Sequence, residues 1–165
     1  MASLIPKNGN DVVFTPDYLV DLCLDWLSNK DYFKSAKSIL DPCCGNGAFF
    51  NKFPDSKNKF WCEITKGADF FEFKEEVDII ISNPPWSLTR KFLNHAMTVT
   101  KTIVFLIPIN HIVGLKARMR DLDTAGFWLT DVLIINTPKE FPQSGFQLGL
   151  CVIRKVRERT TIFHF

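Results

Sequence analysis

The sequence predicts an α/β fold, an open and mostly parallel twisted sheet of about seven strands with helices on both faces. Short segments of strand type alternate with segments of helical period along the chain. The strand-type segments are continuously apolar, which is typical of parallel strands covered on both faces. The last two are joined without a helical pattern, so we expect the last strand to be antiparallel.

The first half of the chain predicts a long helix, three strands and one short helix. Thr15 is a good N-cap and Pro16 suits the first helical position, and apolar residues then recur at helical spacing. The short helix is expected at residues 48–53, before a proline. The strands are expected at residues 38–41, 59–63 and 77–82.

The second half predicts two helices, at residues 87–100 and 110–125. The latter ends at Gly126, a good C-cap. The strands are expected at residues 102–107, 131–135 and 148–153.

Length and composition predict a single domain over residues 1–165. A chain of 165 residues is long enough for one compact domain and too short for two of ordinary size. The hydrophobic fraction of 46% and the charged fraction of 23% are globular and disfavour disorder. We expect residues 1–10 to be a flexible arm and residues 156–165 to be a tail.

Cysteine content, apolar runs and charge indicate the compartment and the partners of the protein. Five irregularly spaced cysteines without a signal peptide favour a reduced, cytoplasmic compartment. Without a CxxC motif or paired histidines we expect no metal, and without a long apolar run we expect no membrane partner. The net charge of +2 neither requires nor excludes nucleic acid, and the Lys/Arg clusters at 116–120 and 154–159 fit either a basic patch or solvated surface.

The turn Asn83-Pro84-Pro85-Trp86 ends an apolar β-branched run and carries the most specific chemistry. Its prolines prevent further ladder pairing and fix the backbone, so the asparagine amide and the adjacent carbonyl are held in one rigid turn beside an indole. Acceptors beside a flat aromatic surface suit a planar group that carries an amine, such as a nucleobase. The alternative interpretation is a strand-ending turn with a core tryptophan.

The turn Asp41-Pro42-Cys43-Cys44-Gly45-Asn46-Gly47 follows the first predicted strand and indicates a cofactor site. Its glycines let the backbone approach a ligand, and α/β proteins bind nucleotides at this edge of the sheet. The turn is neither GxGxxG nor a P-loop, and Asp41 would repel phosphate but attract a cationic amino group. Glu63 is well placed for both hydroxyls of a ribose, and Asp69 adds another acceptor.

In this order, Thr15-Pro16, the Asp41 turn, Glu63, Asp69 and Asn83-Pro84-Pro85-Trp86 resemble the motifs of S-adenosylmethionine-dependent amino-methyltransferases. The chain looks most like the adenine-N6 DNA methyltransferases, over nearly its whole length. The combination of D-P-x-C-G-x-G with N-P-P-aromatic is quite specific. The resemblance implies a Rossmann-like class I methyltransferase domain, S-adenosylmethionine as cofactor and DNA as partner.

The resemblance also implies residue roles. The cofactor would be bound by Thr15, Pro16, Asp41, Pro42, Cys43, Gly45, Gly47, Glu63, Ile64, Asp69, Phe70 and Asn83. Among these, Asp41 would lie near its ammonium, Glu63 at its ribose and Asp69 at its adenine N6. The catalytic motif would be Asn83, Pro84, Pro85 and Trp86.

The polar and aromatic groups of the Asn83-Pro84-Pro85-Trp86 turn suit methylation of an amine. The Asn83 side-chain oxygen and the Pro84 carbonyl would accept both hydrogens of the target amine and make its lone pair available to the methyl donor. Trp86 would stack on the base, a contact worth about 1–3 kcal/mol at comparable sites. The resemblance extends more loosely to the loop at residues 141–146, and it implies that Phe141 or Phe146 would provide a second stacking face, with core packing as the alternative.

The chain departs from the DNA-methyltransferase pattern because it has no room for a target-recognition region. Short loops could provide low specificity, a separate specificity partner could provide it, or the substrate could differ from duplex DNA. Methylation of adenine N6 in RNA is the nearer alternative, and methylation of a protein glutamine is a more distant one. A non-catalytic module that binds nucleic acid or a protein partner is the alternative from another class.

Overall fold

A seven-stranded sheet of order β2-β1-β3-β4-β6-β5-β7 forms the centre of the structure, a computed structural model that describes residues 13–143 and 145–165. The strands are β1 (Ser38–Asp41), β2 (Asn58–Trp61), β3 (Ile79–Ser82), β4 (Thr102–Pro108), β5 (Phe127–Ile135), β6 (Leu148–Lys155) and β7 (Ile162–His164). The helices are α1 (Asp17–Ser28), α2 (Asp31–Ser35), α3 (Thr89–Val99) and α4 (Lys116–Thr124). The predicted arm at residues 1–10 lies outside the described residues.

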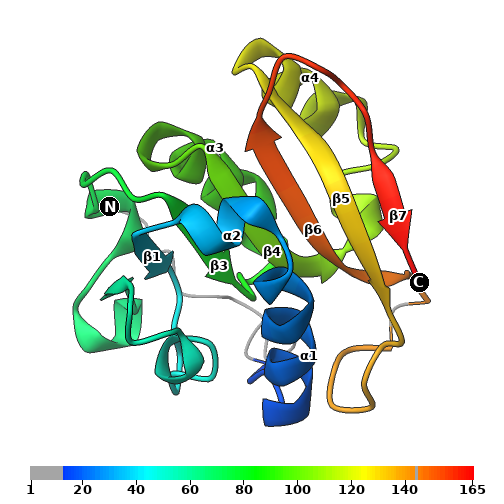
Figure 1. Cartoon of the computed structure of the whole chain (residues 1–165). Helices are drawn as coiled ribbons and strands as arrows, with labels where there is room; N and C mark the ends of the chain where they lie inside the picture. The colour runs from blue at the N-terminus through cyan, green and yellow to red at the C-terminus, as the bar shows by residue number, and fades with distance from the viewer. Residues whose placement is uncertain (1–12, 144) are drawn as a thin grey trace.

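The expected mixed α/β sheet is confirmed. Strands β1 to β4 pair in parallel, whereas β6 is antiparallel to both of its neighbours, β4 and β5. Figure 1 shows α1 and α2 over the near face of the sheet and α3 and α4 behind it. No described helix has the length and apolar character needed to cross a bilayer.

The core is divided by the sheet into two layers, because strands covered on both faces send apolar side chains in both directions. On one face α1 contributes Leu19 and Leu27, which pack with the strand residue Leu106. On the other face α3 contributes Phe92, which lies in the same cluster as Phe105 of β4. Every residue of β3 and β4 is buried, as their continuous apolar runs predict.

Two predicted helices are shorter than expected. Residues 48–53 form only a 3-10 turn at Phe50–Lys52, because a segment confined between Gly47 and Pro54 is too short to offset the cost of helix nucleation. The helix predicted at residues 110–125 is also wrong at its start. A 3-10 turn spans Ile109–His111, and the helix itself begins only after Gly114, whose φ of 87° interrupts helical geometry.

The segment expected to be a tail contains β7, which pairs in parallel with β5. His164 fixes its end, since its Nε2 lies 3.1 Å from Asp131 Oδ1 and its ring lies edge-on to Trp26 at 5.1 Å. The Thr161 hydroxyl donates to the Leu129 carbonyl at 2.6 Å. The antiparallel pairing expected between residues 131–135 and 148–153 is confirmed in β5 and β6, and β7 is an additional strand, parallel to β5.

The anchoring of β7 leads to a stability prediction. His164→Ala should lower the free energy of unfolding by about 1 kcal/mol, the net value of one hydrogen bond. Phe165→Ala is the matched control, because Phe165 is 98% exposed and its loss should change stability by less than about 0.5 kcal/mol. Urea denaturation measures both variants, and equal stabilities would show that β7 is not held by His164.

Candidate active site

A cavity of about 410 Å³ opens at the carboxyl ends of β1, β2 and β3, within the size range of small-molecule and cofactor sites. Because these strands are parallel, the residues that follow them meet at one edge of the sheet. The predicted site residues that line the cavity are Thr15, Asp41, Pro42, Cys43, Gly45, Glu63, Ile64, Asp69, Phe70, Asn83 and Pro85. Those that do not are Pro16, Gly47, Pro84, Trp86, Phe141 and Phe146.

Asp41, the last residue of β1, is a buried carboxylic acid at the floor of this edge. Its Oδ1 accepts hydrogen bonds from the Ser82 hydroxyl at 2.7 Å and from the Cys43 backbone N–H at 3.3 Å. Burial raises the pKa of Asp41 to about 7, and the neighbouring charge of Glu63 adds to this, although the hydrogen bonds oppose it. Near neutral pH the group can therefore take up or release a proton.

The turn after β1 depends on glycine at two positions. Gly45 and Gly47 have φ of 53° and 92°, which side chains rarely tolerate. A Cβ on Gly47 would lie 2.7 Å from Asn51 Nδ2, and one on Gly45 would lie 3.3 Å from the Phe14 ring. The two glycines thus let the turn bend tightly beside the cavity, with the Phe14 and Asn51 side chains packed against it.

Glu63 joins the glycine turn to the segment after β2. Its Oε2 accepts from the Gly45 N–H at 2.8 Å, and its Oε1 accepts from the Thr65 N–H at 3.1 Å and from the Thr65 hydroxyl at 2.7 Å. Burial would raise the pKa of Glu63, but these hydrogen bonds and the Lys66 charge outweigh it and lower the pKa. Glu63 is therefore an ionised, rigidly held acceptor.

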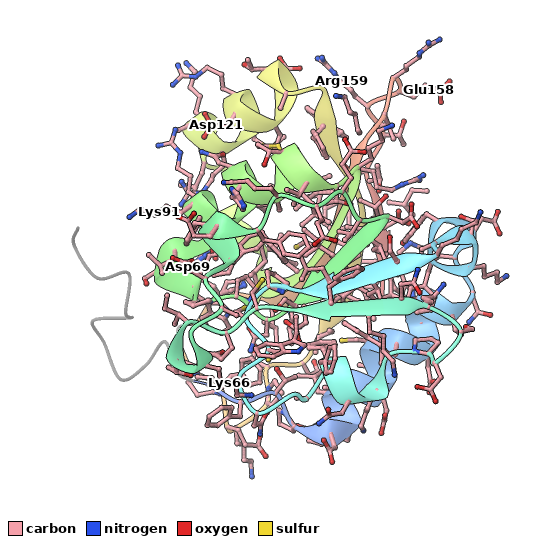
Figure 2. The ribbon with its side chains drawn as sticks, turned by 90° about the vertical axis from the view of Figure 1, so that its left-hand side faces the viewer. Lys66, Asp69, Lys91, Asp121, Glu158 and Arg159 are labelled. Atoms are coloured by element: carbon pink, nitrogen blue, oxygen red, sulfur yellow. The ribbon has the colours of Figure 1, made fainter. Side chains whose placement is uncertain are left out.

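Asp69 and a set of aromatic rings form the next part of the cavity wall. The Asp69 carboxylate accepts the Phe71 N–H at 3.0 Å and so caps a 3-10 turn. The buried Phe70 ring stacks on Phe92 at 5.3 Å, and Phe71 meets Phe92 edge-on at the same centroid distance. Figure 2 shows Asp69 and Lys66 on the same flank of the molecule.

Asn83 lies directly after β3 and uses both ends of its carboxamide. Its Nδ2 donates to the Val13 carbonyl at 3.3 Å and to the Thr15 Oγ1 at 3.2 Å. Its Oδ1 accepts the Trp86 indole N–H at 3.2 Å. The predicted catalytic side chain is therefore held between the segment before α1 and the tryptophan of its own turn.

The three predicted base-stacking residues lie in different surroundings. Trp86 is half-buried, and its indole N–H also approaches the Leu106 carbonyl at 3.4 Å. Phe141 is only 2% exposed and packs on Trp86 at 5.7 Å, so it offers core packing rather than an open ring face. Phe146 is 55% exposed and lines a second cavity, on the loop between β5 and β6.

The cysteines beside the site are neutral thiols. Burial raises the pKa of Cys43 well above its usual range, with Asp41 adding to the effect, and burial also raises the pKa of Cys44. Cys43 Sγ lies 3.0 Å from the Ser82 hydroxyl, within the same hydrogen-bonded group as Asp41. A protonated thiol is a poor nucleophile, so these residues pack and hydrogen-bond at the floor of the site.

The cavity-lining residues that were not predicted as site residues include Phe14, Phe71, Ser82 and Phe92. Ser82 had a signal, since it sits at the end of β3 immediately before Asn83. The three phenylalanines had no such signal, because phenylalanine in an apolar pattern predicts a core residue. Only the fold brings them to the cavity.

Comparison with protein-family models gave no match, and comparison with curated proteins gave none either. Solved structures do match. A putative RNA methyltransferase from Pyrococcus horikoshii has a TM-score of 0.65 and 17% identity, over 92% of this chain and 90% of that one. A putative class I S-adenosylmethionine-dependent methyltransferase from Listeria monocytogenes has a TM-score of 0.62 and 16% identity, over 97% and 68%.

The fold is that of the class I methyltransferases. A third structure, the methyltransferase subunit of a type I restriction-modification system from Streptococcus thermophilus, has a TM-score of 0.66 and 15% identity. The match covers 92% of this chain but only 46% of that subunit. The matched region thus spans nearly all of the Pyrococcus horikoshii protein and less than half of the type I subunit.

The raised pKa of Asp41 predicts how stability depends on pH. Its folded-state pKa of about 7 exceeds the ordinary value of 3.8, so between these values the folded protein holds a proton that the unfolded chain releases. Compared with Asp41→Asn, the wild type should lose stability as pH rises from about 4 to about 7, by a total of about 4 kcal/mol at 1.36 kcal/mol per unit, and no further above 7.

Urea denaturation at a series of pH values measures this difference. Asparagine does not titrate, so any fixed penalty of the substitution shifts the whole difference curve without changing its slope. A difference that stays constant between pH 4 and pH 7 would contradict the raised pKa.

Proposed function

We propose that this protein transfers a methyl group from S-adenosylmethionine to the exocyclic N6 amine of adenine in DNA. The observation that carries the proposal is the position of the Asn83 carboxamide. It lies at the carboxyl end of β3, on the wall of a cavity that the carboxyl groups of Asp41, Glu63 and Asp69 also line. An amine acceptor beside an acidic, aromatic cavity fits an amino-methyltransferase with a cationic nucleoside cofactor.

The residues of the cavity fit that cofactor. Glu63 is ionised, and Oε2 has capacity beyond its bond from Gly45, so it can accept a ribose hydroxyl, whereas Oε1 already accepts two hydrogen bonds from Thr65. Asp41 lies near enough to Glu63 for the Glu63 charge to raise its pKa, and it would face the ammonium of the methionine moiety. Its ionised form is favoured by a nearby cation, so cofactor binding would lower its pKa.

The adenine end of the cofactor would lie near the aromatic wall. Phe70 and Phe71 come from the turn that Asp69 caps, and Ile64 begins the preceding turn with 41% of its side chain exposed. Flat apolar surfaces beside a fixed carboxylate are suited to an adenine ring with an amino group at its edge. In this arrangement Asp69 would accept from the cofactor N6.

In the proposed reaction the C–S bond of the sulfonium would break as the new N–C bond forms, and one of the two amine hydrogens would leave as a proton to water. When bound, S-adenosylmethionine supplies an electrophilic methyl group on a sulfonium. Asn83 Oδ1 and the Pro84 carbonyl would accept the two amine hydrogens, hold the nitrogen close to tetrahedral and direct its lone pair at the methyl carbon. The prolines keep both acceptors in one turn, and the developing positive charge on nitrogen is stabilised by their dipoles.

RNA is the second candidate substrate, because this chain matches nearly the full length of a protein described as a putative RNA methyltransferase. The type I restriction-modification subunit supports DNA, but it is more than twice as long as the matched region. A separate specificity partner would fit the short loops of this chain in either case. Methylation of protein glutamine and a non-catalytic binding role are the remaining outcomes that an assay must separate.

Transfer of label from methyl-labelled S-adenosylmethionine to separate pools of unmethylated DNA, RNA and protein tests the proposal. We expect label in DNA, identified as N6-methyladenine by nucleoside mass spectrometry, and its loss by at least 100-fold in Asn83→Ala, because one amine acceptor is removed. Label in RNA alone would establish the second candidate. Label in protein alone, or none with any pool, would overturn the proposal.

The cofactor site has its own prediction. Glu63→Gln should weaken S-adenosylmethionine binding about 10- to 100-fold, since a hydrogen bond to a charged acceptor contributes about 1.5–3 kcal/mol. Glu76→Gln is the control, an exposed carboxylate outside the cavity, and should bind as the wild type does. Isothermal titration calorimetry measures both, and equal affinities would remove Glu63 from the cofactor site.

A further inference from the structure

We propose that the indole N–H of Trp86 orients the Asn83 carboxamide, so that the site presents an acceptor and not a donor to the target amine. Trp86 is then a positioning residue in addition to any stacking on the base. The inference rests on the proposed function, because it concerns the acceptor that the methyl transfer would use.

The orientation follows from the bonding capacity of the three partners. The Val13 carbonyl can only accept, and an indole N–H can only donate. Asn83 satisfies both only with its amino group towards Val13 and its oxygen towards Trp86, which is the observed arrangement. Turning the amide over would place N–H against N–H and oxygen against oxygen.

The unused hydrogen-bonding capacity of the Asn83 carboxamide determines what it can offer a target amine. The amino group of asparagine has two donor hydrogens, and Nδ2 has two acceptor partners, the Val13 carbonyl and Thr15 Oγ1. Asn83 Oδ1 has two lone pairs and, among the residues that the structure describes, receives one hydrogen bond, from Trp86. The carboxamide therefore retains one acceptor site and no free donor, as one hydrogen of an aromatic amine requires.

The indole itself is held in place. One side of Trp86 packs on the buried Phe141 ring at 5.7 Å, and its N–H also points towards the Leu106 carbonyl of β4. Its ring meets His111 edge-on at 6.4 Å. The indole is thus packed on elements beyond its own turn, and the direction of its N–H is set by the core.

This role distinguishes tryptophan from other aromatic residues at the same position. Phenylalanine could stack on a base but has no polar hydrogen, and a tyrosine hydroxyl can donate or accept. Only the indole combines a flat ring with a group that donates and never accepts. Trp86→Phe therefore removes the orienting hydrogen bond while it keeps an aromatic ring beside Phe141.

The test measures kinetics and hydrogen bonding in the same variants. Trp86→Phe should lower kcat about 3- to 10-fold, the value of one net hydrogen bond, and leave the KM for nucleic acid and the Kd for S-adenosylmethionine within twofold. A role confined to stacking, which phenylalanine can also provide, would leave kcat unchanged. Trp128→Phe, which replaces an indole remote from the cavity, is the control and should behave as the wild type does.

Nuclear magnetic resonance provides a readout that does not need activity. The indole N–H resonance of Trp86, assigned by its absence from Trp86→Phe, should shift in Asn83→Ala and not in Asn51→Ala, whose residue lies outside the cavity lining. An unchanged resonance in Asn83→Ala would overturn the inference even if methyl transfer is found. A shifted resonance with no transfer to any pool would support the hydrogen bond and refute the proposed function.

Thr15 gives an independent variant in case Trp86→Phe does not fold. Thr15→Val keeps the side-chain shape but removes an acceptor for Asn83 Nδ2, whereas Thr15→Ser keeps the hydroxyl. We expect kcat to fall about 3- to 10-fold in Thr15→Val and to recover in Thr15→Ser. Equal kcat in the two variants would show that the orientation of Asn83 does not depend on its hydrogen bond to Thr15.

Discussion

The hydrogen bond between Ser82 and Asp41 joins the ends of the neighbouring strands β3 and β1, and the rest of the site depends on it. Parallel pairing of β1 with β3 aligns Ile39 with Ile79 and Leu40 with Ile80, so the next residues along each strand meet at the sheet edge. The Ser82 hydroxyl then reaches Asp41 Oδ1 at 2.7 Å. This contact connects the glycine turn to the asparagine turn.

That connection has an energetic cost, which is the burial of the Asp41 carboxyl group. Burial of Asp41 disfavours its ionised form and raises its pKa, and a fully apolar residue there would be easier to accommodate. A buried acid without a full ion pair is typical of a functional site rather than of a stable core. The apolar clusters on both faces of the sheet offset this cost, and they contain the large buried side chains of β3 and β4.

The sequence predicted most of the sheet because its strands are covered on both faces and therefore appear as continuous apolar runs. It did not predict β7, since three residues are too few for a pattern and the strand is fixed by distant partners, Asp131 and Trp26. The helix expected at residues 48–53 was wrong because the apolar pattern there does not distinguish an α-helix from a 3-10 turn. Its apolar spacing reflects the burial of Phe49 and Phe53, which a 3-10 turn also achieves.

At the candidate site, the sequence predicted which residues lie at the strand ends better than it predicted which side chains they contact. The acidic and glycine positions follow strand ends, and parallel strands bring such positions together whatever their separation in the chain. The aromatic wall of Phe71 and Phe92 depends instead on packing between a loop and α3. The hydrogen bond from Trp86 to Asn83 could not be predicted either, because a sequence shows an aromatic ring but not the direction of its N–H.

Asn83 contacts both halves of the proposed reaction. Its amino group holds Val13 and Thr15, and this segment also lines the cavity in which the cofactor would bind. Its oxygen faces the indole and retains one acceptor site for the target amine.

A ligand that orders the segment before α1 therefore also restrains the carboxamide, and a target that engages the oxygen restrains the same side chain from the other end. Linkage makes such coupling reciprocal, so cofactor and target should each favour binding of the other. The coupling needs no movement of the sheet, because a single asparagine, fixed at the end of β3, is shared by the two binding events.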